Sequence, residues 1–318
     1  MNNIVFLDAY TLNPGDIDFR VLEELGSLTV YDRTDPIQTE QRCRNADIVI
    51  VNKFKVDDYT LSMMSSVRYI AVAATGYNNI EITEVTRRAI PVSNVKGYGT
   101  ASVAQYVMAG ILSFVNRTDH YVREVRAGRW GASPDFCFYD HSIYDLEGRV
   151  MGIVGYGDIG RKAAQLAKAF GMKVLVHTRT VPNNQEPGIR FTDLHEVFRN
   201  SDVLSLHCPL TPETAGMVRE DTLSMMKESA LLVNTGRGAL VREDDLYEAL
   251  KSGTIAGALL DVLAVEPPPS MVRLSELSNC FITPHIAWAS VESRRNLVNG
   301  VADNVRAFLA GQWINRVY

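Results

Sequence analysis

The segment Val150–Gly171, which reads VMGIVGYGDIGRKAAQLAKAFG, constrains the fold more than any other part of the chain. The largely apolar run Val150–Val154 leads directly into Gly155, Gly157 and Gly160, and a helical pattern of apolar residues follows. This order predicts a strand, a tight turn and a helix. The first glycine permits the turn, the second lets the backbone approach a pyrophosphate, and the third lets the helix pack on the strand. The helix N-terminus offers N–H groups and a positive dipole end to phosphates, so a dinucleotide site explains the segment better than a purely structural turn.

Length, charge and cysteine usage exclude several other classes of protein. A chain of 318 residues forms one or two domains, and a net charge of −5 argues against nucleic acid or an anionic membrane as partner. The four cysteines lie far apart without a C-x-x-C pair, which argues against a disulfide scaffold and a structural zinc site. The chain starts without a signal-peptide pattern and has no apolar run long enough to span a bilayer. We therefore expect a cytoplasmic protein.

Strands and helices alternate on both sides of the glycine turn, which predicts an α/β fold with parallel sheets covered on both faces. Before the turn, the predicted strands are 3–7, 27–31, 47–51, 69–74 and 91–95, and the predicted helices are 18–25, 36–44, 58–65 (capped by Asp57) and 82–88. From the turn onward, the predicted strands are 150–154, 173–176, 203–207, 231–234, 256–262 and 281–283, and further helices are predicted at 194–200, 220–226, 244–252 and 291–310. We expect two doubly wound domains with a ligand cleft between them. The glycine turn lies mid-chain, so the first α/β region is not the dinucleotide domain.

The region between the two α/β parts has a different character. One long helix is predicted over 100–126 from apolar residues at spacings of three and four, namely Val103, Val107, Ile111, Leu112 and Val115. The following segment, Gly128–Tyr144, is irregular, aromatic and proline-containing. It is compatible with an extended, partner-facing arm and equally with a loop packed on its own domain.

Three predicted strand ends after the glycine turn carry polar residues that suit chemistry on a carboxylate. Arg237 lies between Gly236 and Gly238, Asp261 ends a strand five residues before Glu266, and His285 follows a short strand. Carboxyl ends of parallel strands border the ligand crevice. An arginine there can bind a carboxylate through two parallel hydrogen bonds, and a histidine with a carboxylate forms an acid/base pair. A surface arginine and a structural histidine remain the alternatives for each residue taken singly.

Other catalytic classes lack their motifs. The remaining histidines show no metal-binding spacing, and no G-x-S-x-G elbow is present. We expect neither a metal site nor a serine nucleophile.

Together these motifs resemble those of the D-2-hydroxyacid dehydrogenases over essentially the whole chain, most closely the glycerate dehydrogenase/hydroxypyruvate reductase branch. The resemblance is carried by Gly155–Gly160, Asn234–Gly238, Asp261 to Pro267 and Thr283–His285, and for the branch by Ala74–Asn79, Asn94–Gln105 and His285–Ser290. It implies two Rossmann-like domains: a flavodoxin-like substrate domain of residues 1–99 plus 289–318, and a dinucleotide-binding domain of residues 100–288 inserted mid-chain. It also implies reduction of hydroxypyruvate or glyoxylate to the D-2-hydroxy acid with a nicotinamide cofactor.

The resemblance also implies roles for individual residues. Arg237 would bind the substrate carboxylate and polarise its carbonyl, His285 would donate the proton to the ketone, and Glu266 would hold His285 and favour its charged form. Further substrate contacts are implied for Lys53, Thr75 and Gly76. The implied cofactor contacts are Gly155, Gly157, Asp158, Ile159, Gly160, Thr178, Arg179, Cys208, Pro209, Thr235 and Asp261, the last of these meeting the nicotinamide carboxamide. Members are usually homodimers joined through the cofactor domains, by the long helix and the segment after it.

The sequence departs from the NAD-specific pattern at the end of the second strand of the cofactor domain. An acid expected there binds the ribose 2′-hydroxyl, but the chain reads His177-Thr178-Arg179-Thr180. Because Arg179 can pair with a 2′-phosphate, we expect NADP(H) rather than NAD(H), and no metal. The alternative is that Arg179 is a solvated surface residue and NAD binds without an acid. Glu81 replaces the usual aspartate after Asn78-Asn79, which we do not expect to alter the chemistry.

Two other readings compete with this function. One is a sister dehydrogenase acting on D-lactate, phosphoglycerate or formate. Glu266 disfavours the formate type, and we expect no C-terminal regulatory domain of the phosphoglycerate type after Tyr318. The other is a dinucleotide-sensing, co-repressor-like binding protein, which the complete set of Arg237, Glu266 and His285 disfavours.

Overall fold

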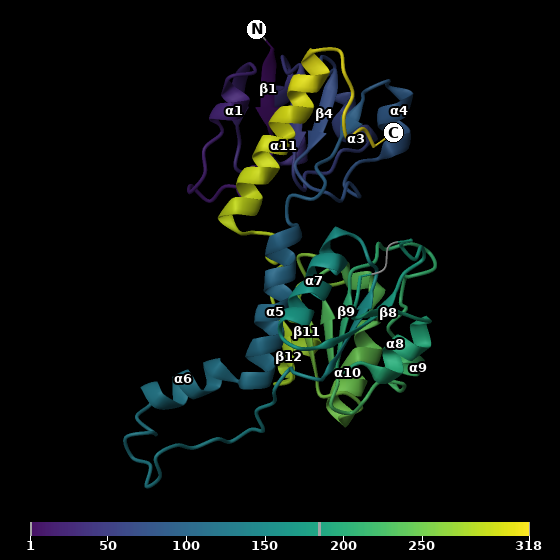
Figure 1. Ribbon diagram of the computed structural model, residues 1–318. Helices are drawn as coiled ribbons and strands as arrows, with labels where there is room; N and C mark the ends of the chain where they lie inside the picture. The colour runs from purple at the N-terminus through teal and green to yellow at the C-terminus, as the bar shows by residue number, and fades with distance from the viewer. Residues whose placement is uncertain (1, 184–185, 318) are drawn as a thin grey trace. The chain divides into compact units, whose positions relative to one another are not determined.

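The computed structural model describes residues 2–183 and 186–317. The chain divides into two compact units, Met1–Gly99 with Trp288–Tyr318 (unit 1) and Thr100–Ala287 (unit 2). The second boundary lies one residue earlier than expected, because Trp288 packs with unit 1, where its ring meets that of Tyr98. Each unit contains a parallel sheet with helices, which confirms the predicted α/β class (Figure 1).

The sheet of unit 1 has the order β2-β1-β3-β4-β5, and its described neighbouring strands pair in parallel. Its strands are β1 (Asn3–Phe6), β2 (Ser27–Val30), β3 (Ile48–Val51), β4 (Tyr69–Val72) and β5 (Val92–Ser93). This is the flavodoxin-like order, and the strand order reverses between β1 and β3. In such sheets, ligands bind at the carboxyl ends of the strands near that point.

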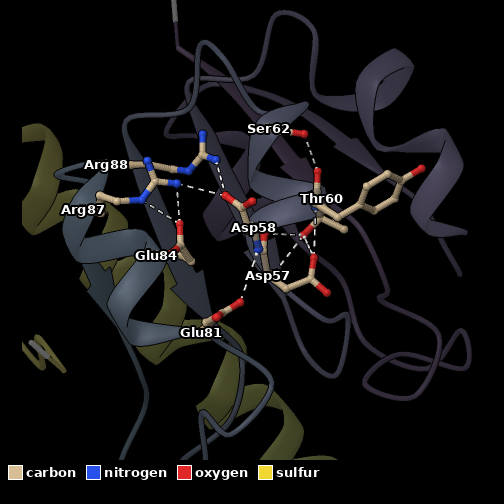
Figure 2. A network of polar contacts seen from close by, with 9 residues as sticks. Asp57, Asp58, Thr60, Ser62, Glu81, Glu84, Arg87 and Arg88 are labelled. Carbon is tan, nitrogen blue, oxygen red and sulfur yellow. Dashed lines mark hydrogen bonds and ion pairs between the residues drawn. The ribbon is translucent and has the colours of Figure 1, made fainter.

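Short helices accompany this sheet, at the predicted places but with fewer turns than expected. They are α1 (Arg20–Glu23), η1 (Pro36–Gln38), α2 (Thr39–Cys43), α3 (Asp58–Ser62) and α4 (Ile82–Arg87). Asp57 caps α3 as predicted, because its carboxylate accepts a hydrogen bond from the Thr60 N–H at 3.1 Å. Figure 2 shows how Arg87 and Arg88 of the α4 end pair with Asp58 of α3, with Glu81 accepting from the Asp58 N–H.

The last helix, α11 (Val291–Leu309), returns to the sheet of unit 1 and covers it (Figure 1). Leu297, Val301 and Val305 are buried in one cluster with Ile4, Phe6 and Ile48 of the strands. Phe308 stacks on Tyr69 with ring centroids 4.5 Å apart. The C-terminal helix is therefore part of the core of the N-terminal sheet.

The sheet of unit 2 has the order β12-β11-β10-β9-β6-β7-β8, again with parallel neighbours. Its strands are β6 (Val150–Val154), β7 (Lys173–His177), β8 (Ile189–Phe191), β9 (Val203–Leu206), β10 (Leu231–Asn234), β11 (Gly257–Leu260) and β12 (Cys280–Ile282). Counted from β6, this is the strand order of a Rossmann fold with one further strand, and the reversal lies between β6 and β9. The sequence analysis missed β8, an edge strand of three residues, which is too short to show a period.

Unit 2 also contains helices and single turns. They are α5 (Thr100–Asn116), α6 (Thr118–Arg126), α7 (Asp158–Ala169), α8 (Leu194–Asn200), α9 (Glu220–Leu223) and α10 (Glu243–Ser252), with single turns η2 (Gly238–Leu240) and η3 (Arg273–Glu276). No helix in the described residues is long and apolar enough to cross a membrane.

The prediction of one helix over 100–126 is wrong. The chain breaks at Arg117, whose φ of 51° is left-handed, so α5 and α6 are separate helices. The buried stripe of α5 ends at Val115, and among the described residues α6 has no buried side chain. The buried apolar contacts of α5 therefore stop before the break.

Residues 128–144 form an extended arm, one of the two alternatives for this segment. In the described part of unit 2, none of these residues belongs to a hydrophobic cluster, and Phe136 is 89% exposed. The arm is held by contacts within it and with α6: the Trp130 indole N–H donates to the Phe136 carbonyl, Arg129 pairs with Asp140, and the Tyr121 hydroxyl accepts the Asp140 N–H. Figure 1 shows α6 and the arm running away from the sheet of their unit.

Candidate active site

Of the three glycines in the turn after β6, two are closely packed and one faces open space. Gly155 has φ +97°, and a Cβ there would lie 2.5 Å from the Cys208 backbone nitrogen. A Cβ on Gly160 would lie 2.2 Å from the Gly155 carbonyl oxygen, whereas one on Gly157 would meet no described atom within 4 Å. The first and third glycines thus bring β6, β9 and α7 together, and the second leaves the backbone accessible to a ligand.

The start of α7 has the donors that a pyrophosphate needs. Its N-cap is Gly157, and no described side chain caps the N–H groups of Asp158, Ile159 and Gly160. The Thr235 hydroxyl, directly after β10, is buried without a hydrogen-bond partner among the described residues. An uncapped helix N-terminus and an unsatisfied hydroxyl at strand carboxyl ends fit a bound dinucleotide.

Cys208 and Pro209 follow β9, where the strand order reverses. The backbone of Cys208 touches the glycine turn, and burial raises the pKa of its thiol to about 11, which keeps the thiol protonated near neutral pH. The sequence analysis missed its neighbour His207, whose Nε2 lies 2.9 Å from the Ser205 hydroxyl oxygen. Burial lowers the pKa of His207 to about 4, which keeps this ring uncharged near neutral pH.

Asp261, at the end of β11, organises the loop that carries His285. Its carboxylate accepts hydrogen bonds from the Thr283 hydroxyl at 2.7 Å and from the N–H groups of Ile286 and Ala287 at 2.9 and 2.8 Å. His285 itself has a left-handed backbone, with φ of 56°. The buried Asp261 therefore shapes this loop, a role that the sequence analysis did not foresee.

His285 and Glu266 form a direct pair. The His285 Nδ1 lies 2.6 Å from the Glu266 Oε2, and the Glu266 Oε1 accepts the Leu263 N–H at 2.8 Å. Both side chains are about one-third exposed, so the pair is reachable from outside. A carboxylate on Nδ1 orients the ring and stabilises the imidazolium.

Arg237 lies on the neighbouring turn after β10. The Asn234 amide donates to the Arg237 carbonyl at 2.9 Å and accepts the Gly236 N–H at 3.1 Å, which fixes the turn. A Cβ on Gly238 would lie 1.9 Å from the Leu263 carbonyl carbon, so the Arg237 turn and the loop of Glu266 touch backbone to backbone. The Glu243 carboxylate also accepts the Ala264 N–H of that loop. The structure thus brings together the segments of all three predicted catalytic residues in unit 2.

The end of β7 carries Thr178 and Arg179, and Arg179 is exposed. Hydrogen bonding to Thr211 lowers the pKa of Glu213, and the charge of Arg179 lowers it as well. A carboxylate from the loop after β9 thus lies within the electrostatic reach of Arg179. The sequence analysis missed this residue, because nothing local links Glu213 to the end of β7.

The predicted substrate contacts Lys53, Thr75 and Gly76 lie in unit 1. Lys53 follows β3, and the other two follow the adjacent strand β4. The Thr75 hydroxyl donates to the Val95 carbonyl at 2.8 Å, and the Thr75 carbonyl accepts from the Asn94 amide at 2.6 Å. All three residues are therefore at the carboxyl edge of the sheet.

Residues 2–183 and 186–317 contain no group of three or more His, Cys, Asp or Glu side chains suited to a metal ion.

Comparison with known proteins identifies the family. Residues 108–287 match the model described as "D-isomer specific 2-hydroxyacid dehydrogenase, NAD binding domain", which covers more than half of the chain. The chain belongs to this family. It is 41% identical to a hydroxypyruvate reductase of Blautia hydrogenotrophica over 99% of both chains. It is also 38% identical to a glycerate dehydrogenase of Methylorubrum extorquens, over 97% of this chain and 96% of the relative.

A solved structure agrees with this assignment. The NADPH-dependent glyoxylate/hydroxypyruvate reductase of Sinorhizobium meliloti superposes with a TM-score of 0.85 at 28% identity, covering 100% of this chain and 98% of that one. The predicted family, the Rossmann-like fold and the class of NAD(P)-dependent oxidoreductase are confirmed. These comparisons also place the chain with enzymes that interconvert small 2-oxo and 2-hydroxy acids.

Proposed function

We propose that this protein reduces hydroxypyruvate or glyoxylate to the D-2-hydroxy acid, with His285 as the proton donor and NADP(H) favoured over NAD(H). The observation that carries the proposal is the 2.6 Å contact between His285 Nδ1 and Glu266, on a loop in contact with the Arg237 turn. Unit 2 serves as the dinucleotide-binding domain and unit 1 as the substrate domain.

The chemistry of these residues accounts for the reaction. A bound nicotinamide supplies the hydride. The Arg237 guanidinium binds the substrate carboxylate and polarises the carbonyl, because its planar fork matches a carboxylate. Since Glu266 engages Nδ1, proton donation to the carbonyl oxygen falls to the Nε2 of His285. Lys53 adds positive charge for the substrate carboxylate. The backbone of Thr75 and Gly76 adds N–H groups for it.

The residues that fit a dinucleotide are assigned accordingly. Gly155, Gly157 and Gly160 with the start of α7 hold the pyrophosphate, Thr235 and Asp261 lie on the nicotinamide side, and Cys208 and Pro209 line the strand reversal. Thr178 and the exposed Arg179 take the 2′-phosphate of NADPH, because the strand end itself supplies no acid for a ribose hydroxyl; the charge of Arg179 also acts on Glu213, which belongs to the loop after β9.

A homodimer joined through unit 2 is part of the same proposal. The arm exposes the aromatic side chains of Trp130, Phe136 and Tyr139, and apolar side chains gathered on an exposed segment suit a contact with a second chain. Sedimentation equilibrium at micromolar concentration is expected to give twice the chain mass, and a monomer would contradict it.

The substrate assignment is tested by an activity panel. Purified protein is assayed on hydroxypyruvate, glyoxylate, pyruvate and 3-phosphohydroxypyruvate, each with NADH and with NADPH. We expect the highest kcat/KM for hydroxypyruvate or glyoxylate with NADPH. A preference for pyruvate would indicate a lactate-type enzyme, a preference for NADH would refute the role of Arg179, and no turnover at all would favour a binding protein.

The proton-donor assignment is tested by substitution. His285→Ala is expected to lower kcat by about 10²- to 10⁴-fold, the usual contribution of general acid catalysis, while the Kd of the cofactor stays unchanged. Glu266→Gln lowers kcat as well, since the ring loses its carboxylate partner. His195→Ala, at an exposed histidine of α8, is the matched control and retains full activity. Normal turnover by His285→Ala would rule out this role.

A further inference from the structure

Asp8, which the sequence analysis did not single out, gathers three consecutive backbone N–H groups of another loop. Its Oδ1 accepts the Asn52 N–H at 2.7 Å, and its Oδ2 accepts those of Lys53 at 2.5 Å and Phe54 at 2.7 Å. The chain separates Asp8 from this loop by more than forty residues. One carboxylate therefore determines the backbone path through Lys53.

The contact lies where the sheet of unit 1 reverses its strand order. Asp8 follows β1, the loop follows β3, and β1 and β3 are neighbours in the order β2-β1-β3-β4-β5. Ligands of such sheets bind at this edge. The loop of Lys53 is thus held at the place where a substrate domain is expected to receive its ligand.

Burial of the Asp8 carboxylate costs solvation free energy. Burial raises the pKa of Asp8, against the three backbone N–H groups and the charge of Lys53, which favour the anion. A simple turn anchor is also served by a neutral asparagine or serine, which costs less to bury. Two carboxylate oxygens, however, can accept all three N–H groups at once.

A second tie connects this loop with the other predicted substrate contacts. The buried Asn52 amide donates to the Ala73 carbonyl at 2.6 Å and accepts from the Thr11 hydroxyl at 3.0 Å. Ala73 follows β4 and lies two residues before Thr75. The hydrogen bond between Asn52 and Ala73 therefore fixes the loops of Lys53 and Gly76 relative to each other.

We propose that Asp8 is a positioning residue, which fixes the Asn52–Phe54 loop so that Lys53 is presented to the carboxylate of the 2-oxo acid. The inference rests on the proposed function, in which Lys53 contacts the substrate. It predicts an effect on substrate affinity that passes through Lys53 and leaves cofactor affinity alone.

The test is a double-mutant cycle of Asp8→Asn and Lys53→Met on the full-length enzyme. Asparagine keeps the shape of Asp8 but replaces one acceptor by an NH₂ group that opposes the loop N–H donors. Loss of one such charge-assisted hydrogen bond corresponds to a rise in the KM of hydroxypyruvate of about tenfold. We expect kcat and the Kd of NADPH, measured by fluorescence titration, to change less than about twofold. In the Lys53→Met background, Asp8→Asn is expected to raise KM no further.

Asp18→Asn, at an exposed carboxylate of unit 1, is the matched control and keeps the wild-type KM. If Asp8→Asn lowers the unfolding temperature by more than about 5 °C, which for a chain of this size exceeds about 1 kcal/mol, Asp8→Glu enters the same cycle in its place.

Each other outcome has a distinct meaning. Additive effects of the two substitutions on KM would overturn the inference and leave the proposed function intact. An unchanged KM for Lys53→Met would remove Lys53 from the substrate site and overturn the inference through its premise. Wild-type protein inactive on every 2-oxo acid would instead mark failure of the proposed function itself.

Discussion

Two histidines of unit 2 follow strand ends but differ in their surroundings. His285 pairs with the Glu266 carboxylate on a reachable loop, whereas His207 meets only the Ser205 hydroxyl among its described polar side-chain contacts and is kept neutral by burial. Both follow a short apolar strand in the sequence. The chemistry of each residue is therefore decided by what lies beside it in space.

The neutral His207 makes stability depend on pH. Its folded pKa of about 4 lies below the ordinary value of 6.5, so between these values the unfolded chain binds the proton and the folded chain does not. Stability from this group is complete above pH 6.5 and is lost as pH falls toward 4. From pH 7 to pH 5, the free energy of unfolding is expected to fall by about 2 kcal/mol through His207.

Urea unfolding at both pH values measures this loss. His207→Gln is expected to remove that part of the pH dependence, whereas His195→Gln, at an exposed position, leaves it unchanged. An equal loss in His207→Gln and wild type would show that another group is responsible.

At the scale of elements, close backbone contacts couple segments that the sequence presents separately. The turn of Arg237 touches the loop of Glu266 at Gly238, and the glycine turn touches the end of β9 at Gly155. The break between α5 and α6 coincides with the end of the buried stripe of α5 at Val115, just before Arg117. Most of the predicted helices and strands are correct in position and type. The wrong predictions lie where close contacts between segments begin or end.

Gly238→Ala tests the contact between the two catalytic segments. The added Cβ would overlap the Leu263 carbonyl, so the loop must move and carry Glu266 with it. Overpacking of this kind costs about 2 kcal/mol, and we expect a lower unfolding temperature together with a lower kcat. Gly236→Ala is the matched control for stability, because its Cβ meets only ordinary contacts of 3.4 Å or more. Equal unfolding temperatures for the two variants would contradict the contact.

For the whole molecule, the two units build their cores separately. In the described residues, each hydrophobic cluster draws its members from one unit alone. Unit 1 nevertheless depends on the end of the chain, since α11 supplies Leu297, Val301 and Val305 to its core. Unit 2 is therefore inserted in the middle of a chain whose two end regions together form the core of unit 1.

A chain ending at Ala287 tests this dependence. Burying one Leu or Val side chain contributes about 1.5–3 kcal/mol to stability. Loss of α11 therefore removes more free energy than the net stability of unit 1. Hydrogen exchange is expected to show lost protection in residues 1–99 and retained protection in the strands of unit 2. Retained protection in β1, β3 and β4 would contradict the expectation.

The sequence by itself determined the features that depend on local order: apolar runs for most strands, the strand–glycine–helix signal at Val150–Gly171, and polar residues at strand ends such as Arg237 and His285. With the family motifs, these were enough to predict the fold class and the candidate catalytic residues. The tertiary structure alone decided the order of the strands, the short edge strand β8 and the break at Arg117.

The tertiary structure also decided which carboxylate binds which loop. Asp8 accepts N–H groups from residues 44 to 46 positions away, and Asp261 holds the His285 loop from more than twenty positions away. The donors in these contacts are backbone amides, which every residue except proline carries, so no residue type marks them in the sequence. Only the folded chain shows which amides meet which carboxylate.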